Sequence, residues 1–316
     1  MSINKYSCYT DLMLDIISLG TVSIDLYYKG DSLTRGDGRF ELAIGGKYYA
    51  DHFYQGLGGG GANVAIGAAK AGLGVGLIAK IGNNPFKDMI YSTLSESNIY
   101  HKEYCDIEAE YINISSILLD PKGEKTIINY RTPHQHVITC AADFQKIDNT
   151  KAIYMANLSK VALTERIDIL KYAKEKEIKV FANLNVTDCR RPIEQILHFV
   201  RFVDVTIINS HEYADMIKVP FQAIDFHQNI VKKYSLFNED KILVVTDGRK
   251  GSYAYYEGKV YHEKAAKVTE VVDTTGAGDA YTAGFIAFYL STQDIQASMK
   301  AGALYAVKIL GKIGAN

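Results

Sequence analysis

The stretch Asp273-Thr-Thr-Gly-Ala-Gly-Asp279-Ala-Tyr-Thr-Ala-Gly-Phe285 combines a glycine-rich turn with the start of a helix. In the turn, Gly276, Ala277 and Gly278 can aim successive backbone N–H groups at one point. The positive end of the helix dipole adds to that field. Such a cradle suits a phosphoryl group, whose charge must be stabilised while it is transferred. The stretch therefore predicts an anion hole, which we expect to follow a strand at Val268–Val272.

Asp279 falls in the first turn of the predicted helix, beside this cradle. A carboxylate at this place can accept the proton of an attacking hydroxyl group, which makes Asp279 a candidate general base. An acidic residue in a first turn can also act only by complementing the helix dipole. The residue by itself leaves both roles open.

A second glycine-rich segment, Gly58-Gly-Gly-Gly-Ala-Asn63-Val-Ala65, also enters a helix. Residues without Cβ let a ligand approach the backbone, although a tight turn with close helix packing is the alternative. Together with Gly56, the segment satisfies the dinucleotide-binding spacing G-x-G-x-x-G. That motif also needs a buried strand before it and an acidic residue about 20 positions later. Residues 48–54 make a poor buried strand and position 80 is Lys80, so we reject a nicotinamide cofactor.

Short apolar runs alternate with helical patterns along most of the chain. The runs show little alternation of apolar and polar residues, as expected of strands that are buried on both faces. Apolar residues recur at helical spacing after each glycine-rich segment and after Asn84-Pro85. This succession predicts an α/β fold with a mostly parallel sheet covered by helices. The expected strands are Asp15–Leu19, Val75–Ile81, Ala152–Asn157, Lys179–Asn183, Val205–Asn209 and Ile242–Thr246.

Two regions interrupt this succession. The stretch from Val22 to Tyr54 is rich in Tyr, Gly and β-forming residues and has no helical period. The stretch from Tyr111 to Tyr130 holds two β-rich runs around the turn Asp120-Pro-Lys-Gly123. We therefore expect a single domain over residues 1–316, with a small sheet formed by about residues 22–57 and 111–131 that stands off the main one.

Composition excludes several classes of protein. The net charge of −1 and the lack of a long basic block argue against a nucleic-acid partner. Four cysteines without C-x-x-C spacing suit free thiols in a reducing cytoplasm. The apolar stretch Leu12–Leu19 is interrupted by Asp15 and is too short for a membrane span. The P-loop pattern G-x-x-x-x-G-K-[ST] and the protein-kinase patterns H-R-D and D-F-G are absent from the sequence.

Taken together, the two glycine-rich segments resemble the signatures of the ribokinase-like (PfkB) carbohydrate kinase family. Gly58–Ala65 resembles its G-G-x-x-A-N signature, and Asp273–Phe285 resembles its D-T-x-G-A-G-D signature. The resemblance runs from about Asp15 to the C-terminus. It implies a three-layer α/β/α sandwich with a β lid over a sugar substrate, and ATP and Mg²⁺ as cofactors. It also implies Asp279 as the catalytic base and Gly276, Ala277 and Gly278 as the anion hole.

The resemblance assigns further positions in the site. Substrate contacts fall on Asp25, Gly59, Gly60, Asn63 and Arg131. Nucleotide contacts fall on Asn185, Thr246, Gly248, Gly251 and Thr275. Asn209 and Glu212 match the N-x-x-E motif that organises Mg²⁺, and their spacing is also that of a capping box at a helix start.

Two positions bear on the substrate. Gly60 stands where ribokinases typically carry Lys, which argues against ribose. The pair Tyr130-Arg131 resembles a pair found in some hexose and keto-acid sugar kinases. Arginine suits a carboxylate or phosphate through its paired donors, while a plain surface arginine is the alternative.

The leading hypothesis is therefore an ATP-dependent kinase that phosphorylates a sugar hydroxyl group. A nucleoside kinase of the same fold is the alternative, because aromatic residues between Tyr27 and Tyr54 can flank a purine or pack a homodimer through the lid. A non-catalytic regulatory protein is a third hypothesis, against which the intact Asp279 and its glycines argue. The resemblance also implies a monovalent-cation site near the C-terminal segment. Members of the family often continue further and complete that site there, whereas this chain ends at Asn316, soon after Gly314-Ala315, so K⁺ is left open.

Overall fold

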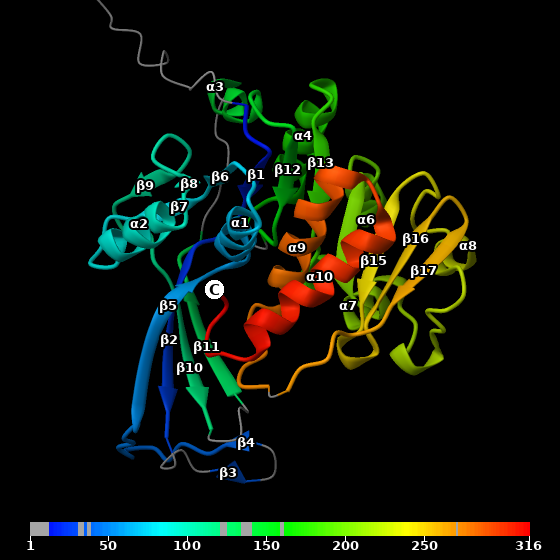
Figure 1. The fold of residues 1–316 in the computed structure, drawn as a ribbon. Helices are drawn as coiled ribbons and strands as arrows, with labels where there is room; N and C mark the ends of the chain where they lie inside the picture. Colours follow the sequence, from blue (N-terminus) through cyan, green and yellow to red (C-terminus); the bar gives the residue numbers. More distant parts are fainter. Residues whose placement is uncertain are drawn as a thin grey trace, which may run out of the picture.

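The main sheet of the computed structural model has nine strands in the order β17-β16-β15-β14-β13-β12-β1-β6-β8 (Figure 1). The structure describes residues 13–30, 35–36, 39–120, 125–133, 141–158, 161–269 and 271–316. From β15 to β8 neighbouring strands run parallel, whereas β16 and β17 are antiparallel. The strands are β1 (Ile16–Leu19), β6 (Val75–Ile78), β8 (Ile99–Tyr100), β12 (Ala152–Met155), β13 (Lys179–Ala182), β14 (Val205–Asn209), β15 (Ile242–Thr246), β16 (Ser252–Tyr256) and β17 (Lys259–Glu263). The predicted mostly parallel sheet is confirmed.

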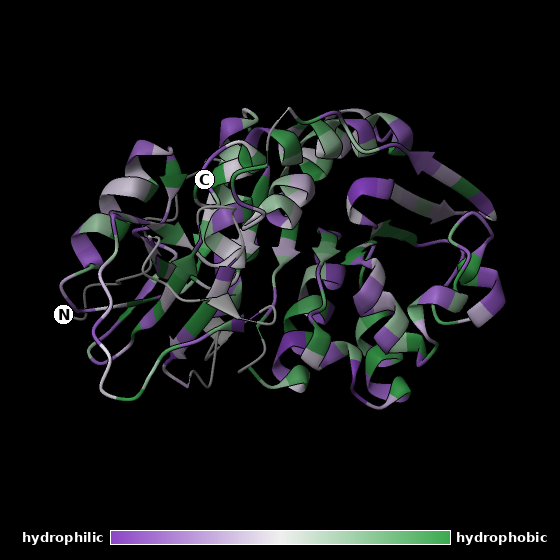
Figure 2. Ribbon diagram, turned by 90° about the horizontal axis from the view of Figure 1, so that it is seen from below, coloured by the Kyte–Doolittle hydropathy of each residue, from purple (hydrophilic) through white to green (hydrophobic). Residues whose placement is uncertain are grey.

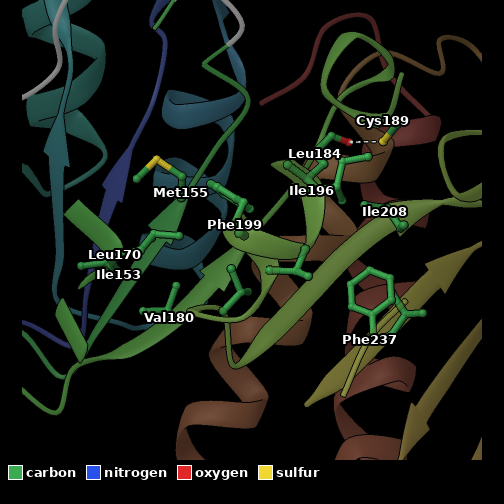
Figure 3. Close-up of a cluster of buried hydrophobic side chains, with 14 of the residues drawn as sticks. Ile153, Met155, Leu170, Val180, Leu184, Cys189, Ile196, Phe199, Ile208 and Phe237 are labelled. Carbon is green, nitrogen blue, oxygen red and sulfur yellow. Dashed lines mark hydrogen bonds between the residues drawn. The ribbon is translucent and has the colours of Figure 1, made fainter. Parts of the chain in front are cut away.

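Helices cover both faces of this sheet because its strands are apolar on both sides. In β12, Met155 belongs to a core shared with α4, α6, α7 and α8, part of which is drawn in Figure 3. Its neighbour Tyr154 belongs to the opposite core, shared with α1, α2, α9 and α10. The outer helices carry both polar and apolar residues (Figure 2), in keeping with one buried side each. The helices are α1 (Gly60–Lys70), α2 (Lys87–Glu96), α4 (Leu163–Glu175), α6 (Ile193–Val200), α7 (Ser210–Ile217), α8 (Ile230–Tyr234), α9 (Ala277–Thr292) and α10 (Ile295–Leu310).

A separate four-stranded sheet, which we call the small sheet, projects from the main body (Figure 1). Its order is β11-β10-β2-β5, with β2 and β10 parallel and the other pairs antiparallel. Its strands are β2 (Ser23–Lys29), β5 (His52–Gly58), β10 (Asn113–Leu119) and β11 (Lys125–Arg131). These strands come from the two segments that the sequence singled out. Residues 31–34, 37–38 and 121–124 of those segments lie outside the described residues.

Two expectations about strands were wrong. The run Val75–Ile81 is divided between β6 and β7 (Lys80–Gly82), and β7 pairs with β9 (Asp106–Glu108) outside the main sheet. The run Val268–Val272 forms no strand at its described residues. Instead the Val272 N–H donates to the Leu310 carbonyl at 2.8 Å, so this segment is held by the end of α10 rather than by a sheet edge.

The remaining elements are short. They are β3 (Arg35–Gly36), β4 (Arg39–Phe40), α3 (Ala141–Phe144), α5 (Val186–Cys189) and 3₁₀ turns at Gln145–Ile147, Phe221–Ala223 and Gly248–Lys250. Among the helices that the structure describes, none combines the length and the apolar content needed to cross a membrane.

Close packing of α1 on α9 brings the two glycine-rich segments together. A Cβ atom added at Gly67 would lie 2.6 Å from the Cβ of Ala283, so the two helices approach more closely than larger residues allow. Gly59, the N-cap of α1, has a φ of 93° and would place a Cβ 2.5 Å from the Thr21 carbonyl oxygen. Only glycine fits this turn, and α1 consequently begins beside the end of β1.

Candidate active site

A polar cavity of about 300 Å³ opens at the carboxyl ends of the parallel strands. Side chains at or just after the strand ends line one side: Thr21, Asn157, Asn183, Asn209 and Thr246. The carboxyl ends of parallel strands form the crevice where open α/β sheets bind ligands. The other lining residues are Gly60 from α1, Gly278, Asp279 and Thr282 from α9, Arg131 from the small sheet, Asn185, Ile207, Ile208 and Glu212.

Asp279 lies in the cavity where α1 and α9 meet. Asn63 Nδ2 donates a hydrogen bond of 2.8 Å to Asp279 Oδ2, and Asn316 Nδ2 donates one of 3.0 Å to Asn63 Oδ1. Burial raises the pKa of Asp279 to about 6; the bond from Asn63 opposes this rise and the charge of Asp25 adds to it. A pKa close to neutrality suits a group that accepts a proton from a hydroxyl group.

The turn before α9 has the form expected of an anion hole. Gly276 is the N-cap of α9 and has a φ of 75°, a conformation that glycine adopts without steric cost. An added Cβ at Gly276 would collide with Ala315. Ala277 and Gly278 follow in the first turn, where N–H groups have no partner within the helix. An added Cβ at Gly278 would meet no atom within 4 Å, so open space borders this backbone beside Asp279.

Asn209 and Glu212 form a capping box at the start of α7. The Glu212 N–H donates to Asn209 Oδ1 at 2.8 Å, and the Asn209 N–H donates to Glu212 Oε2 at 2.9 Å. Burial raises the pKa of Glu212 to about 7, its bonds with Asn209 oppose the rise, and the nearby charge of Asp279 adds to it. Two carboxylates that repel each other in one cavity would gain from a divalent cation.

The donor set fits Mg²⁺ rather than a metal held by protein alone. Within the described ranges, no three His, Cys, Asp or Glu side chains converge on a point. Mg²⁺ typically uses one or two carboxylates, several waters and the phosphates of the substrate. Glu212 offers such a carboxylate at the cavity wall.

Two asparagines are held at the cavity by a buried ion pair. Asn185 Oδ1 accepts the Asp188 N–H at 2.8 Å, and Asn185 Nδ2 donates to Asn157 Oδ1. Arg166 of α4 binds the Asp188 carboxylate through hydrogen bonds of 2.9 and 2.7 Å. Both charged side chains are buried, so the pair anchors α5 and thereby orients the Asn185 amide.

The small sheet contributes one charge to the cavity wall and a second close behind it. Arg131, at the end of β11, lines the cavity. Asp25 of β2 is buried and accepts a hydrogen bond of 3.1 Å from Ser23 Oγ. Burial raises the pKa of Asp25 although hydrogen bonds from Ser115 and Ser23 and the charge of Arg131 oppose this.

The predicted site residues fall into two groups. The cavity wall includes Gly60, Arg131, Asn185, Asn209, Glu212, Thr246, Gly278 and Asp279. Asp25, Gly59, Asn63, Gly248, Gly251, Thr275, Gly276 and Ala277 are not part of that wall. Of these, Asn63 acts on the cavity through its bond to Asp279. Gly251 has a φ of 98°, and an added Cβ would collide with the Glu263 carbonyl oxygen. The backbone conformation is therefore enough to account for glycine at this position, without a contact to the nucleotide.

The sequence left four polar residues of the wall without a role: Thr21, Asn157, Asn183 and Thr282. Asn157 was predicted to be the last residue of the strand Ala152–Asn157. A polar residue at the carboxyl end of a buried parallel strand is the pattern that could have identified it as a cavity residue. Thr282 lies one turn beyond Gly278, whose carbonyl accepts its hydroxyl group at 2.9 Å. Because residues four positions apart lie on the same face of a helix, the position of Thr282 relative to Gly278 could have identified it as a cavity residue.

Comparisons with known proteins identify the family of the chain. The model of the pfkB family of carbohydrate kinases matches residues 13–316. The chain is 26% identical over 325 residues to the 5-dehydro-2-deoxygluconokinase of Bacillus subtilis, covering 98% of this chain and 93% of that protein. It is 29% identical over 254 residues to a probable chloroplastic fructokinase-6 of Arabidopsis thaliana, covering 75% of this chain and 63% of that protein.

A solved structure shows the same fold. The ribokinase of Arabidopsis thaliana, complexed with ribose and ATP, superposes with a TM-score of 0.80 at 20% identity, covering 96% of this chain and 95% of that one. The family model extends over both glycine-rich segments, which the fold brings together through the bond from Asn63 to Asp279. The chain therefore belongs to the pfkB family of carbohydrate kinases.

Proposed function

We propose that this kinase transfers the γ-phosphoryl group of ATP to a sugar hydroxyl group, with Asp279 as the general base. The observation that carries the proposal is the place of Asp279: its carboxylate lies in a polar cavity, next to the open first turn of α9. Its pKa of about 6 leaves it ionised at neutral pH, yet basic enough to accept a proton.

The chain's own residues account for each part of the transfer. Asp279 takes the hydroxyl proton, and the bond from Asn63 aims its carboxylate. The backbone N–H groups of the turn at Gly276, Ala277 and Gly278 receive the charge of the transferred group. Glu212 and Asn209 would hold the water shell of Mg²⁺, which supplies charge neutralisation at the ATP phosphates when bound. The small sheet acts as a lid that excludes water and so prevents hydrolysis of ATP.

Arg131 supports a sugar acid as the acceptor. Its guanidinium lines the same cavity as Asp279, and its paired donors match a carboxylate. The Bacillus subtilis relative is named for a sugar acid, which agrees with this chemistry. If the guanidinium instead contacts the transferred phosphoryl group, the acceptor need not carry a carboxylate. The substrate screen below therefore includes neutral sugars.

The outer face of the small sheet supports a homodimer formed through the lid. Phe53, Ile128 and Tyr130 are 54%, 58% and 58% exposed there. The strand register puts them on the face opposite to Asp25 and Arg131. A second copy of the chain, presenting the same face, would cover these apolar side chains symmetrically. The buried free thiols of Cys105 and Cys189 support a reducing, cytoplasmic location.

An ATP-coupled phosphorylation screen over neutral sugars, sugar acids and nucleosides tests the proposal. We expect turnover of a sugar or sugar acid, and a loss of about 10² to 10⁴-fold in kcat for Asp279→Asn. Asp204→Asn is the matched control, because Asp204 binds Lys174 and Lys241 away from the cavity. Equal turnover by wild type and Asp279→Asn would show that Asp279 is not the general base. Turnover of nucleosides alone would show that the protein is a nucleoside kinase rather than a sugar kinase.

A further inference from the structure

An ion pair links the small sheet to the turn that precedes α9. Lys125, the first residue of β11, places its Nζ 2.8 Å from Asp273 Oδ1 and 2.5 Å from Thr275 Oγ1. The Asp273 side chain is fully buried, and that of Lys125 is 20% exposed. Burial would raise the pKa of Asp273, but hydrogen bonds from Lys125 and Thr275 hold it below its ordinary value. A cation carried by the small sheet therefore balances a buried negative charge beside the anion hole.

The other contacts of Asp273 occupy the rest of its carboxylate. Oδ1 also accepts the Thr275 N–H at 2.9 Å and the Thr275 hydroxyl group at 2.7 Å. Oδ2 accepts the Gly314 N–H at 3.2 Å. Gly314 belongs to the C-terminal segment beside which the family resemblance implies a K⁺ site. An alkali cation needs free oxygen ligands, whereas this carboxylate is surrounded by hydrogen-bond donors. The residues present do not fit K⁺ at this carboxylate.

We infer that the Lys125 ammonium is the fixed cation of this anion hole and takes the place of a monovalent metal ion. Lys125 is a positioning residue: it holds Thr275, which directly precedes the N-cap Gly276, and Asp273, which lies two positions before Thr275. A buried carboxylate this close to the phosphate site would oppose an anionic ligand unless a cation balanced it. The inference rests on the kinase function proposed above.

The location of Lys125 on β11 connects this charge to the lid. Arg131 lies six positions after Lys125, an even offset, so both side chains leave the same face of the strand. One strand thus brings Arg131 to the cavity and Lys125 to the turn before α9. Movement of the small sheet away from α9 would withdraw both charges together. Closing the lid therefore completes the anion hole.

The first test uses the unmodified protein. The kcat/KM for ATP is measured with an accepted sugar in KCl and in tetramethylammonium chloride at equal ionic strength and equal Mg²⁺. We expect the two values to agree within about twofold, with the same thermal unfolding midpoint in both salts. Stimulation by K⁺ of about tenfold, or a rise in Tm specific to K⁺, would overturn the inference. Absence of phosphoryl transfer to any acceptor would instead contradict the proposed kinase function, and the Tm comparison would still decide the K⁺ question.

Variants of Lys125 provide the second test. Lys125→Met should lower kcat/KM for ATP by about tenfold or more in either salt. Lys125→Ala should lose as much in tetramethylammonium chloride, but regain activity and rise in Tm when K⁺ or NH₄⁺ is added. Lys29→Ala is the matched control, because Lys29 and Lys125 both pair with Leu119 in the small sheet. Wild-type kcat/KM in Lys125→Met, or a loss in Lys125→Ala that no cation relieves, would overturn the inference.

Discussion

Replacing Asp279 by Asn should make the protein more stable while it makes the enzyme inactive. Burial raises the pKa of this carboxyl from its ordinary value of 3.8 to about 6. A carboxyl group with a raised pKa binds its proton more tightly in the folded state, so the ionised form destabilises the fold above that pKa. Asn63 opposes the shift only in part. A neutral amide of the same shape removes the cost of the buried charge.

The size of the gain follows from the shift. A difference of about two pH units corresponds to about 3 kcal/mol of unfolding free energy at pH 8, where Asp279 is ionised in both states. The carboxyl group borders a cavity open to water, so we expect a measured gain of about 1 to 3 kcal/mol. As the pH falls through 6 the native carboxyl takes up its proton, and the gain should shrink to about half by pH 5.

Urea unfolding followed by far-UV circular dichroism measures this gain, since the chain contains no tryptophan. Wild type and Asp279→Asn are compared at pH 8, 6 and 5. Asp204→Asn is the control of opposite sign, because hydrogen bonds from Lys174, the Val180 N–H and Lys241 outweigh burial and lower the pKa of Asp204. That control should lose the same amount of stability at pH 8 and at pH 5, because Asp204 is ionised in the folded and the unfolded state at both values and its contribution fades only below about pH 3.8. An Asp279→Asn protein that is no more stable than wild type at pH 8 would contradict the expected gain.

Four other predictions concern the same site and the small sheet. Asn63→Ala removes the donor to ionised Asp279, so the acid limb of the kcat/KM profile should move to higher pH by about one unit; an unmoved limb would contradict this. Glu212→Gln should raise the Mg²⁺ concentration for half-maximal rate by about tenfold, measured by Mg²⁺ titration. Arg131→Met should raise KM for a sugar acid by about tenfold and for a neutral sugar by much less, and equal effects would argue against carboxylate binding. Ile128→Asp should convert dimer to monomer in size-exclusion chromatography with light scattering, whereas a monomeric wild type would exclude the dimer.

Features that depend on neighbouring residues could be predicted from the sequence. The strands Val205–Asn209 and Ile242–Thr246 were found at their observed bounds, because burial on both faces leaves a mostly apolar run. The turn at Gly276 was found because its conformation demands glycine. Local preference failed at Val268–Val272, where the contact with Leu310 decides the structure.

Contacts between segments that are far apart in the chain could not be predicted from the sequence. Nothing near Lys125 in the sequence indicates that its ammonium meets Asp273, because the pairing depends on how the small sheet lies against α9. The bond from Asn316 to Asn63 is of the same kind. Family signatures identify the groups that do chemistry, whereas these supporting contacts follow only from the folded arrangement.

The bond between Asn63 and Asp279 joins residues 216 positions apart, and β1 is an inner strand of the main sheet that pairs with both β6 and β12. During synthesis on the ribosome, Asn63 of α1 therefore cannot reach its partner until α9, which carries Asp279, has emerged. Fragments truncated before α9 should therefore be inert, and nascent chains should expose the unpaired surface of α1 to chaperones until α9 has emerged from the ribosome.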